Sequence, residues 1–216
     1  MTLEEIIDTM RNAMGGGGEP LVRPEKGQLE KLVSYGEVIT RADCSDMDLS
    51  GAELSGGIFE HVDFSGVNLN GAKIKESVLV HMNLSGASAV GADLHNITFH
   101  ESNLEGMDLT DAVLTDSNVV KSNLKGVKLV NADLGVGKFV ECDMTGADLS
   151  NCRFERGALY ETPMKGVVFD GADLEQTVFL NADLSGISLK GTRVFRAFLK
   201  DSKLVNMDFS GLDLSM

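Results

Sequence analysis

The sequence predicts an all-β protein whose chain winds into a solenoid of short, nearly identical faces. From residue 41 to residue 215 it divides into thirty-five consecutive five-residue units without an insertion. The fourth position of every unit is apolar, and the second is uncharged and mostly small. The chain holds 24 Gly but no Trp and only two Tyr. Because aromatic rings are the usual filling of a wide core, this composition favours a narrow, repetitive one.

Residues 1–40 precede the repeat and predict a short α-helical segment. Thr2 and Glu5 have the spacing of a capping box at the start of a helix. Four apolar residues recur at helical spacing and form one face of this helix. They are Leu3, Ile6, Ile7 and Met10. The glycine run at 15–18 ends the helix.

A second, shorter helix is expected over residues 28–35, with Leu29, Leu32 and Val33 facing inward. It leads to Gly36 and the first strand. A solenoid needs a cover on its first open coil, so residues 1–40 are expected to cap the repeat domain of residues 41–215. The alternative is that the N-terminal helix docks on a partner.

Each five-residue unit predicts a short extended face followed by a corner. Its second and fourth residues point inward, separated by one outward residue, and the glycines frequent in the first position suit a corner at positive φ. Four such faces close a square coil. The fourth-position side chains then stack along a central core. Large members of this stack are Phe59, Phe99, Leu134, Phe139 and Phe179.

The units resemble those of the pentapeptide-repeat family, whose consensus is A(D/N)LXX. The segments GADLH, NADLG, GADLS, GADLE and NADLS match it almost letter for letter. The resemblance implies a right-handed quadrilateral β-helix with four units, or twenty residues, in each coil. The thirty-five units would therefore make about nine coils.

Composition narrows the cellular setting. No stretch has the eighteen or so apolar residues that would span a bilayer, and the N-terminus lacks a basic and apolar leader. A cytoplasmic protein without membrane contact is expected. Cys44, Cys142 and Cys152 have no metal-ligand spacing and are expected to be unpaired, buried thiols. The net charge of −14 argues against direct nucleic-acid binding, which needs a basic surface.

No catalytic motif is present, so neither enzyme activity nor a cofactor is expected. The glycine run lacks the Lys and Ser or Thr of a phosphate-binding loop. One corner column brings His61, His81 and Glu101 onto successive coils, a combination that could in principle bind a metal ion. Their side chains should point outward in parallel, without converging, so no metal site is predicted.

The central outward position of the third face alternates in charge from coil to coil. Its column predicts an exposed ladder of ion pairs between coils. The column reads Glu53, Lys73, Asp93, Val113, Asp133, Arg153, Asp173, Arg193 and Asp213. Such pairs neutralise acidic groups that a charged binding surface would need.

The fourth face of each coil carries many apolar residues at outward positions, which predicts an interaction surface. Leu214 is the last fourth-position residue of the repeat, so the final coil is expected to leave backbone groups and apolar side chains uncovered, a situation that invites pairing. A protein partner or a homodimer is expected to cover this region. The predicted interface residues are Tyr160, Val178, Leu180, Phe195, Phe198, Leu212 and Leu214.

Three functions remain open from the sequence. The first is a non-catalytic protein-binding or scaffold module that presents an apolar face of a rigid solenoid. The second follows from the resemblance: some pentapeptide-repeat proteins mimic DNA and bind gyrase, a type II topoisomerase. Residues 41–120 suit that role with thirteen acids and three bases, whereas residues 121–216 have thirteen and twelve. The third, also from the family, is an accessory or effector protein of a bacterial secretion system.

Overall fold

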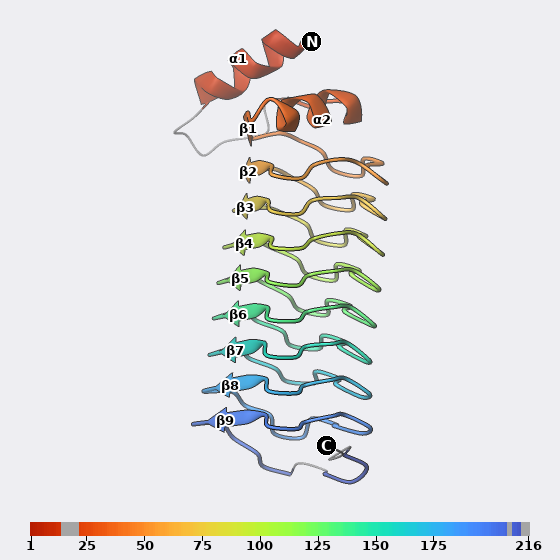
Figure 1. The fold of residues 1–216 in the computed structure, drawn as a ribbon. Coiled ribbons are helices and arrows are strands. Elements are labelled where there is room, and N and C mark those ends of the chain that lie inside the picture. The colour runs from red at the N-terminus through yellow and green to blue at the C-terminus, as the bar shows by residue number, and fades with distance from the viewer. Residues whose placement is uncertain (14–21, 207–208, 213–216) are drawn as a thin grey trace.

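A computed structural model describes residues 1–13, 22–206 and 209–212 of the chain. In this part, nine parallel strands form one sheet in sequence order, β1 to β9, as Figure 1 shows. The strands are β1 Val38–Thr40, β2 Ile58–Glu60, β3 Val78–Val80, β4 Thr98–His100, β5 Asn118–Val120, β6 Lys138–Val140, β7 Ala158–Tyr160, β8 Val178–Leu180 and β9 Phe198–Lys200. The chain is thus the predicted all-β solenoid, and β1 to β9 mark about eight turns, close to the nine expected.

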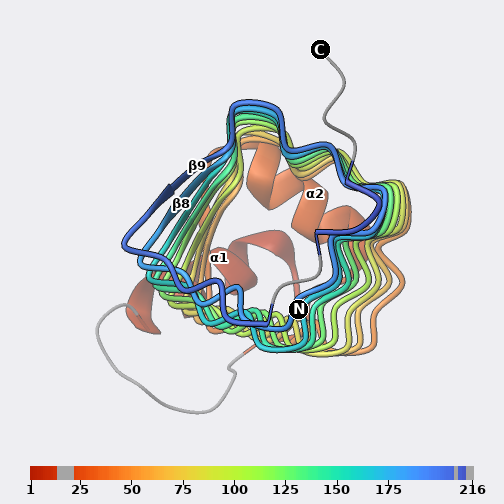
Figure 2. The ribbon, with the colours of Figure 1, turned by 90° about the horizontal axis from the view of Figure 1, so that it is seen from below.

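Pairing repeats at an interval of twenty residues on all four faces. The strands form the fourth face, where Ile58 pairs with Val78. The other three faces pair through single parallel bridges, such as Asp43 with Asp63. A view along the axis shows the coils superposed around one lumen (Figure 2). The four-sided coil predicted from the five-residue period is therefore confirmed.

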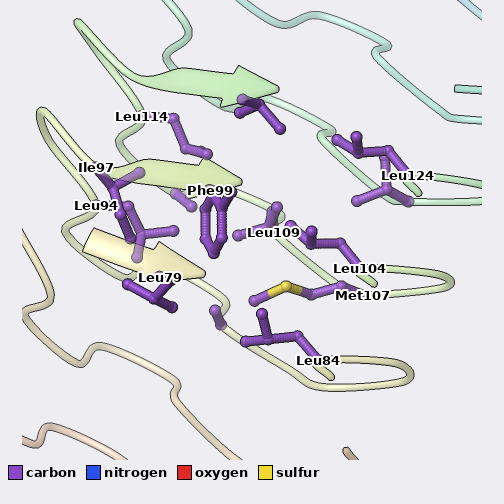
Figure 3. Packing of buried hydrophobic residues seen from close by; sticks show 14 of the residues in the cluster. Leu79, Leu84, Leu94, Ile97, Phe99, Leu104, Met107, Leu109, Leu114 and Leu124 are labelled. Carbon is purple, nitrogen blue, oxygen red and sulfur yellow. The ribbon is translucent and has the colours of Figure 1, made fainter. Parts of the chain in front are cut away.

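The lumen is filled by side chains from the second and fourth positions. Figure 3 shows Leu79, Phe99 and Leu114 directed into this core from different segments of the coils. All five predicted members of the core stack are buried, at 0 to 3% exposure. Glycine at a second position makes room for rings: a Cβ added to Gly57 or Gly157 would overlap the ring of Phe59 or Phe154, respectively.

The first position of each unit adopts a left-handed backbone conformation, whether or not it is glycine. His61 has φ 53° and Asn96 has φ 54°. Asn and Asp tolerate this region better than most residues, but a β-branched side chain does not. Val136, at φ 63°, is therefore a strained corner.

The N-terminal segment contains two helices, α1 (Leu3–Ala13) and α2 (Lys26–Ser34). The predicted capping box of α1 is formed: the Thr2 amide donates to Glu5 Oε2 at 2.7 Å, and the Glu5 amide donates to Thr2 Oγ1 at 3.2 Å. Ile6 and Met10 are buried, while Leu3 and Ile7 are partly buried against the same core. The second helix begins two residues before the predicted 28, because Glu25 is its N-cap and Gln28 completes a capping box with it.

Helix α2 lies over the first coil, and both helices cross the lumen in the axial view (Figure 2). The residues Leu29, Leu32 and Val33 of α2 are buried. Polar contacts hold the segment in place: Lys26 Nζ donates to the Ser50 carbonyl at 2.5 Å, and Arg23 pairs with Asp43 at 2.8 Å. In the described residues, neither helix is long and apolar enough to cross a membrane.

Candidate interaction surface

The fourth face is the one broad β-surface among the described residues, and its outward side chains are the first and third of each strand. Ile58 and Val78 near the N-terminal end are exposed, as are Tyr160 and Phe198 near the other end. Val178 and Leu180 are partly exposed. Polar residues stand between these groups at the first position of three central strands. They are Thr98, Asn118 and Lys138. The first-position column is therefore apolar only toward the two ends of the face, whereas the third-position column stays apolar through Val120 and Val140.

Phe195 lies at the corner that leads into β9 and is partly buried. The guanidinium of Arg196 stands 4.9 Å from the centre of its ring. A cation over an aromatic face is attracted by the ring electrons, which fixes both side chains beside the strand. Phe198, on the strand itself, projects outward and is 54% exposed.

The last described coil exposes residues that fill the core elsewhere. Leu199, Leu204 and Phe209 occupy fourth positions but are 42 to 54% exposed, because the described residues include no further coil to cover them. Val205 beside them is also exposed. The interface prediction from the sequence missed all four. The signal was present, since the reasoning applied to Leu212 and Leu214 holds for any fourth-position residue of a terminal coil.

A small cavity opens among these terminal side chains. It measures about 80 Å³, and its lining side chains are all apolar. They include Phe179, Leu189, Leu199, Leu204, Phe209 and Leu212. Leu212 is partly buried there. Leu214 lies outside the described residues.

The remaining surface is crossed by ladders of polar contacts between coils. The predicted ion ladder is formed by Lys73 with Glu53 at 2.6 Å, Arg153 with Asp133, and Arg193 with Asp173 at 3.0 Å. The Glu53 carboxylate raises the pKa of Lys73. The Lys73–Glu53 pair is exposed and the other two pairs are partly exposed, so each contributes little to stability. They do neutralise much of the acidic charge along the third face.

The first face carries an amide ladder. Asn103 Nδ2 donates to Asn83 Oδ1 at 3.3 Å, and Asn123 Nδ2 donates to Asn103 Oδ1 at 3.0 Å. Identical side chains stacked between coils satisfy one another and need no ligand. Asp43 heads this column, where hydrogen bonds from the hydroxyl and amide of Ser45 lower its pKa.

Three of the four histidines form a cluster on one corner, whereas His95 lies beside Thr115 and Asp116. The rings of His61 and His81 stack at 4.7 Å, and His100 meets His81 edge-on at 6.3 Å. Glu101 lies 3.5 Å from His81 and 3.9 Å from His100. His100 was missed from the sequence because it stands one position before the corner. Across the described residues, no three His, Cys, Asp or Glu side chains are placed to hold a metal ion.

The three cysteines are unpaired and buried, as predicted. Burial raises the pKa of Cys44 and Cys152 to about 12 and that of Cys142 to about 11. Because the thiolate is the reactive form, these side chains act as small apolar core residues.

Comparison with sequence families agrees with the repeat geometry. Residues 52–134 match the family described as the pentapeptide repeat region, and residues 117–156 and 164–194 match pentapeptide repeats. The chain belongs to the pentapeptide-repeat family. A comparison with curated proteins finds no match.

Solved structures of other pentapeptide-repeat proteins resemble the chain. Full-length QnrB1, a plasmid-mediated fluoroquinolone resistance protein, is 20% identical, with a TM-score of 0.43 over 83% of this chain and 90% of that one. HetL, involved in heterocyst differentiation regulation in the cyanobacterium Nostoc sp. strain PCC 7120, is 21% identical, with a TM-score of 0.35 over 88% and 96%. Rfr23 from the cyanobacterium Cyanothece 51142 is 20% identical, with a TM-score of 0.21 over 73% and 90%.

Proposed function

We propose that this pentapeptide-repeat protein is a non-catalytic protein-binding module. Its binding surface would be the C-terminal end of the solenoid together with the adjoining part of the fourth face. The observation that carries the proposal is the exposure of Leu199, Leu204 and Phe209 at core positions. Phe198 and Tyr160 extend this apolar surface onto the fourth face. Contiguous exposed apolar side chains of this kind mark interaction sites, and aromatic residues dominate interface energies.

The N-terminal end supports this assignment by contrast. There, Leu29, Leu32 and Val33 of α2 cover the equivalent opening, and α1 packs behind them through Ile6 and Met10. The two ends of the described solenoid are thus chemically different. A partner that recognises the open end would bind in a single orientation.

Site-specific photo-cross-linking tests the proposal. A photoreactive phenylalanine analogue at Phe198 should cross-link, in the native host, to a defined protein or to a second copy of the chain. The same analogue at Ile58, on the far part of the same face and 45% exposed, is the matched control. Light scattering of the purified protein reads self-association directly. A monomer that yields no cross-link specific to position 198 would contradict the proposal.

A DNA mimic that binds a type II topoisomerase is the second candidate. Residues 41–120 favour it, because they carry thirteen acids against three bases. Gyrase supercoiling assays with the purified protein test it. Inhibition that weakens with salt and is lost when Asp108, Asp111 and Asp116 are neutralised would support mimicry. The first proposal expects no inhibition.

A further inference from the structure

We propose that the exposed edge of β9 accepts an extended acidic segment of a partner protein as an additional parallel strand. This inference rests on the proposed protein-binding function and specifies its binding mode. It follows from three features of the last described coil: its backbone hydrogen bonding, the register of its side chains and its charge.

Among the described residues, the backbone of β9 forms hydrogen bonds with β8 along only one of its two edges. The Phe198 amide donates to the Thr177 carbonyl at 2.8 Å, and the Lys200 carbonyl accepts from the Asn181 amide at 3.0 Å. Both residues therefore face β8. Because successive residues of a parallel strand turn their backbone groups to opposite sides, the amide and carbonyl of Leu199 face the other edge. In the described part of the chain, no strand lies there. Such an edge is a template for strand addition.

The pairing of β9 with β8 predicts which kinds of side chain an added strand would have at each position. Phe198, Leu199 and Lys200 pair with Val178, Phe179 and Leu180 of the preceding coil. A strand added in the same register would place an outward residue over Phe198, an inward one over Leu199 and an outward one over Lys200. The inward residue would meet the apolar cavity of about 80 Å³ and should be large and apolar.

The basic residues around β9 favour an acidic partner segment. Residues 190–206 contain five bases and one acid, although the whole chain has a net charge of −14. Arg193 and Lys203 pair with acids of the preceding coil, so Arg196 and Lys200 matter most for a partner. Arg196 precedes β9 and Lys200 is its last residue, and both side chains are exposed. An acid opposite Lys200 would form a cross-strand pair. The required pattern is apolar, large apolar, acidic.

The chain contains this pattern in β2, whose residues are Ile58, Phe59 and Glu60. A synthetic peptide of residues 56–65 is therefore a suitable probe. Its Ile58 would lie over Phe198, its Phe59 over Leu199 and its Glu60 over Lys200. In this register the peptide's Glu60 amide donates to the Leu199 carbonyl, whereas its Phe59 amide faces away from β9.

The experiment measures anisotropy of the labelled peptide against the full-length protein, at concentrations where light scattering gives the monomer mass. We expect saturable binding of the wild-type peptide. A peptide N-methylated at Glu60 should lose binding at least about tenfold, because one backbone hydrogen bond is removed from the edge. The peptide N-methylated at Phe59 is the matched control and should keep its affinity.

A charge exchange tests the register separately. The Glu60→Lys peptide should bind wild-type protein about three- to fivefold more weakly, as expected for one exposed cross-strand pair. The same peptide should regain affinity for the Lys200→Glu protein. Both readouts leave the core residues of the solenoid unchanged.

Absence of binding, or equal effects of the two N-methyl groups, would overturn strand addition. A protein that stays dimeric through this edge at every measurable concentration would overturn it too, because a second copy would then be the occupant. A cross-link specific to position 198 that persists despite either result would leave the protein-binding function standing and remove only this mode.

Discussion

Phe179 and Leu199 occupy the same inward position on the paired strands β8 and β9, yet Phe179 is 3% exposed and Leu199 is 43% exposed. The two side chains occupy the same repeat position and differ in whether the described residues include a further coil that covers them. Each inner coil is covered by a neighbouring coil on both sides, whereas the last described coil has one neighbour. The consequences of this dependence can be measured residue by residue.

Leu134 is fully buried near the middle of the core stack, so Leu134→Asp should unfold the protein. An unpaired carboxylate in an apolar lumen should cost more than about 4 kcal/mol. Circular dichroism during heating measures the effect. Asp133→Ala is the neighbouring control: it removes an exposed pair with Arg153 and should cost about 1 kcal/mol or less. Equal melting temperatures for Leu134→Asp and wild type would contradict the inward assignment.

Val136→Asn should stabilise the protein by about 1 kcal/mol, because it places a residue that tolerates positive φ at a corner now held by a β-branched one. Asn96 occupies the same corner two coils earlier, at φ 54°. Asn96→Val should therefore destabilise by a similar amount. Denaturant unfolding measures both variants, and changes of the same sign would refute the strain argument.

The native protein should not react with a thiol reagent such as Ellman's at pH 8. The pKa values of Cys44 and Cys152, about 12, and of Cys142, about 11, leave almost no thiolate at this pH. Three thiols should react after unfolding in denaturant. Val113→Cys, at an exposed outward position, is the positive control. Rapid labelling of a native cysteine would show that the core opens readily.

Acid should loosen the contact between the N-terminal segment and the first coil. Hydrogen bonds from Ser45, with help from the Arg23 guanidinium, hold the pKa of Asp43 below 3.8, its ordinary value. A carboxyl whose folded pKa is depressed stabilises the fold above its unfolded pKa, and this stabilisation is lost as pH falls through the folded value. The free energy of unfolding should therefore fall below about pH 4.

Asp43→Asn should show a smaller loss of stability between pH 6 and pH 3 than wild type does. Ser45→Ala should act in the same direction, because it removes the hydroxyl hydrogen bond to Asp43. Guanidinium unfolding at the two pH values gives the comparison. An identical pH dependence in all three proteins would exclude Asp43 as a contributor.

Reasoning from the sequence predicted most of the fold because the repeat makes each position nearly independent of distant context. The inward assignment of Phe59, Leu134 and Phe139 needs only the five-residue period. The start of α2 was placed two residues late, because Gln28 is the partner of the Glu25 cap and lies inside the helix. The first residue of a helix depends on individual capping hydrogen bonds, and a periodic pattern of apolar residues does not reveal these bonds.

The candidate surface was predicted less completely. Phe198 and Tyr160 are exposed, as predicted for outward positions. Phe195 is partly buried and its ring contacts Arg196. The prediction did not name four exposed apolar residues of the last described coil, which are Leu199, Leu204, Val205 and Phe209. The outward side of a strand can be inferred from its alternation. Which coil is left uncovered, and which side chains then surround a cavity, depends on how the coils stack.

The sequence by itself determined the five-residue face, the inward and outward positions and the alternating charges of the third face, because each follows from a short period along the chain. Only the tertiary structure decided that α2 covers one end, that phenylalanine rings pack over Gly57 and Gly157, and that residues at core positions are exposed around β9. The first feature joins residues about twenty positions apart. The second joins near neighbours, Phe59 with Gly57 and Phe154 with Gly157, but depends on how each ring is oriented in the core. The third depends on the absence of a neighbouring coil in the described chain. Their energies arise from contacts across space, and the local pattern of residues does not specify those contacts.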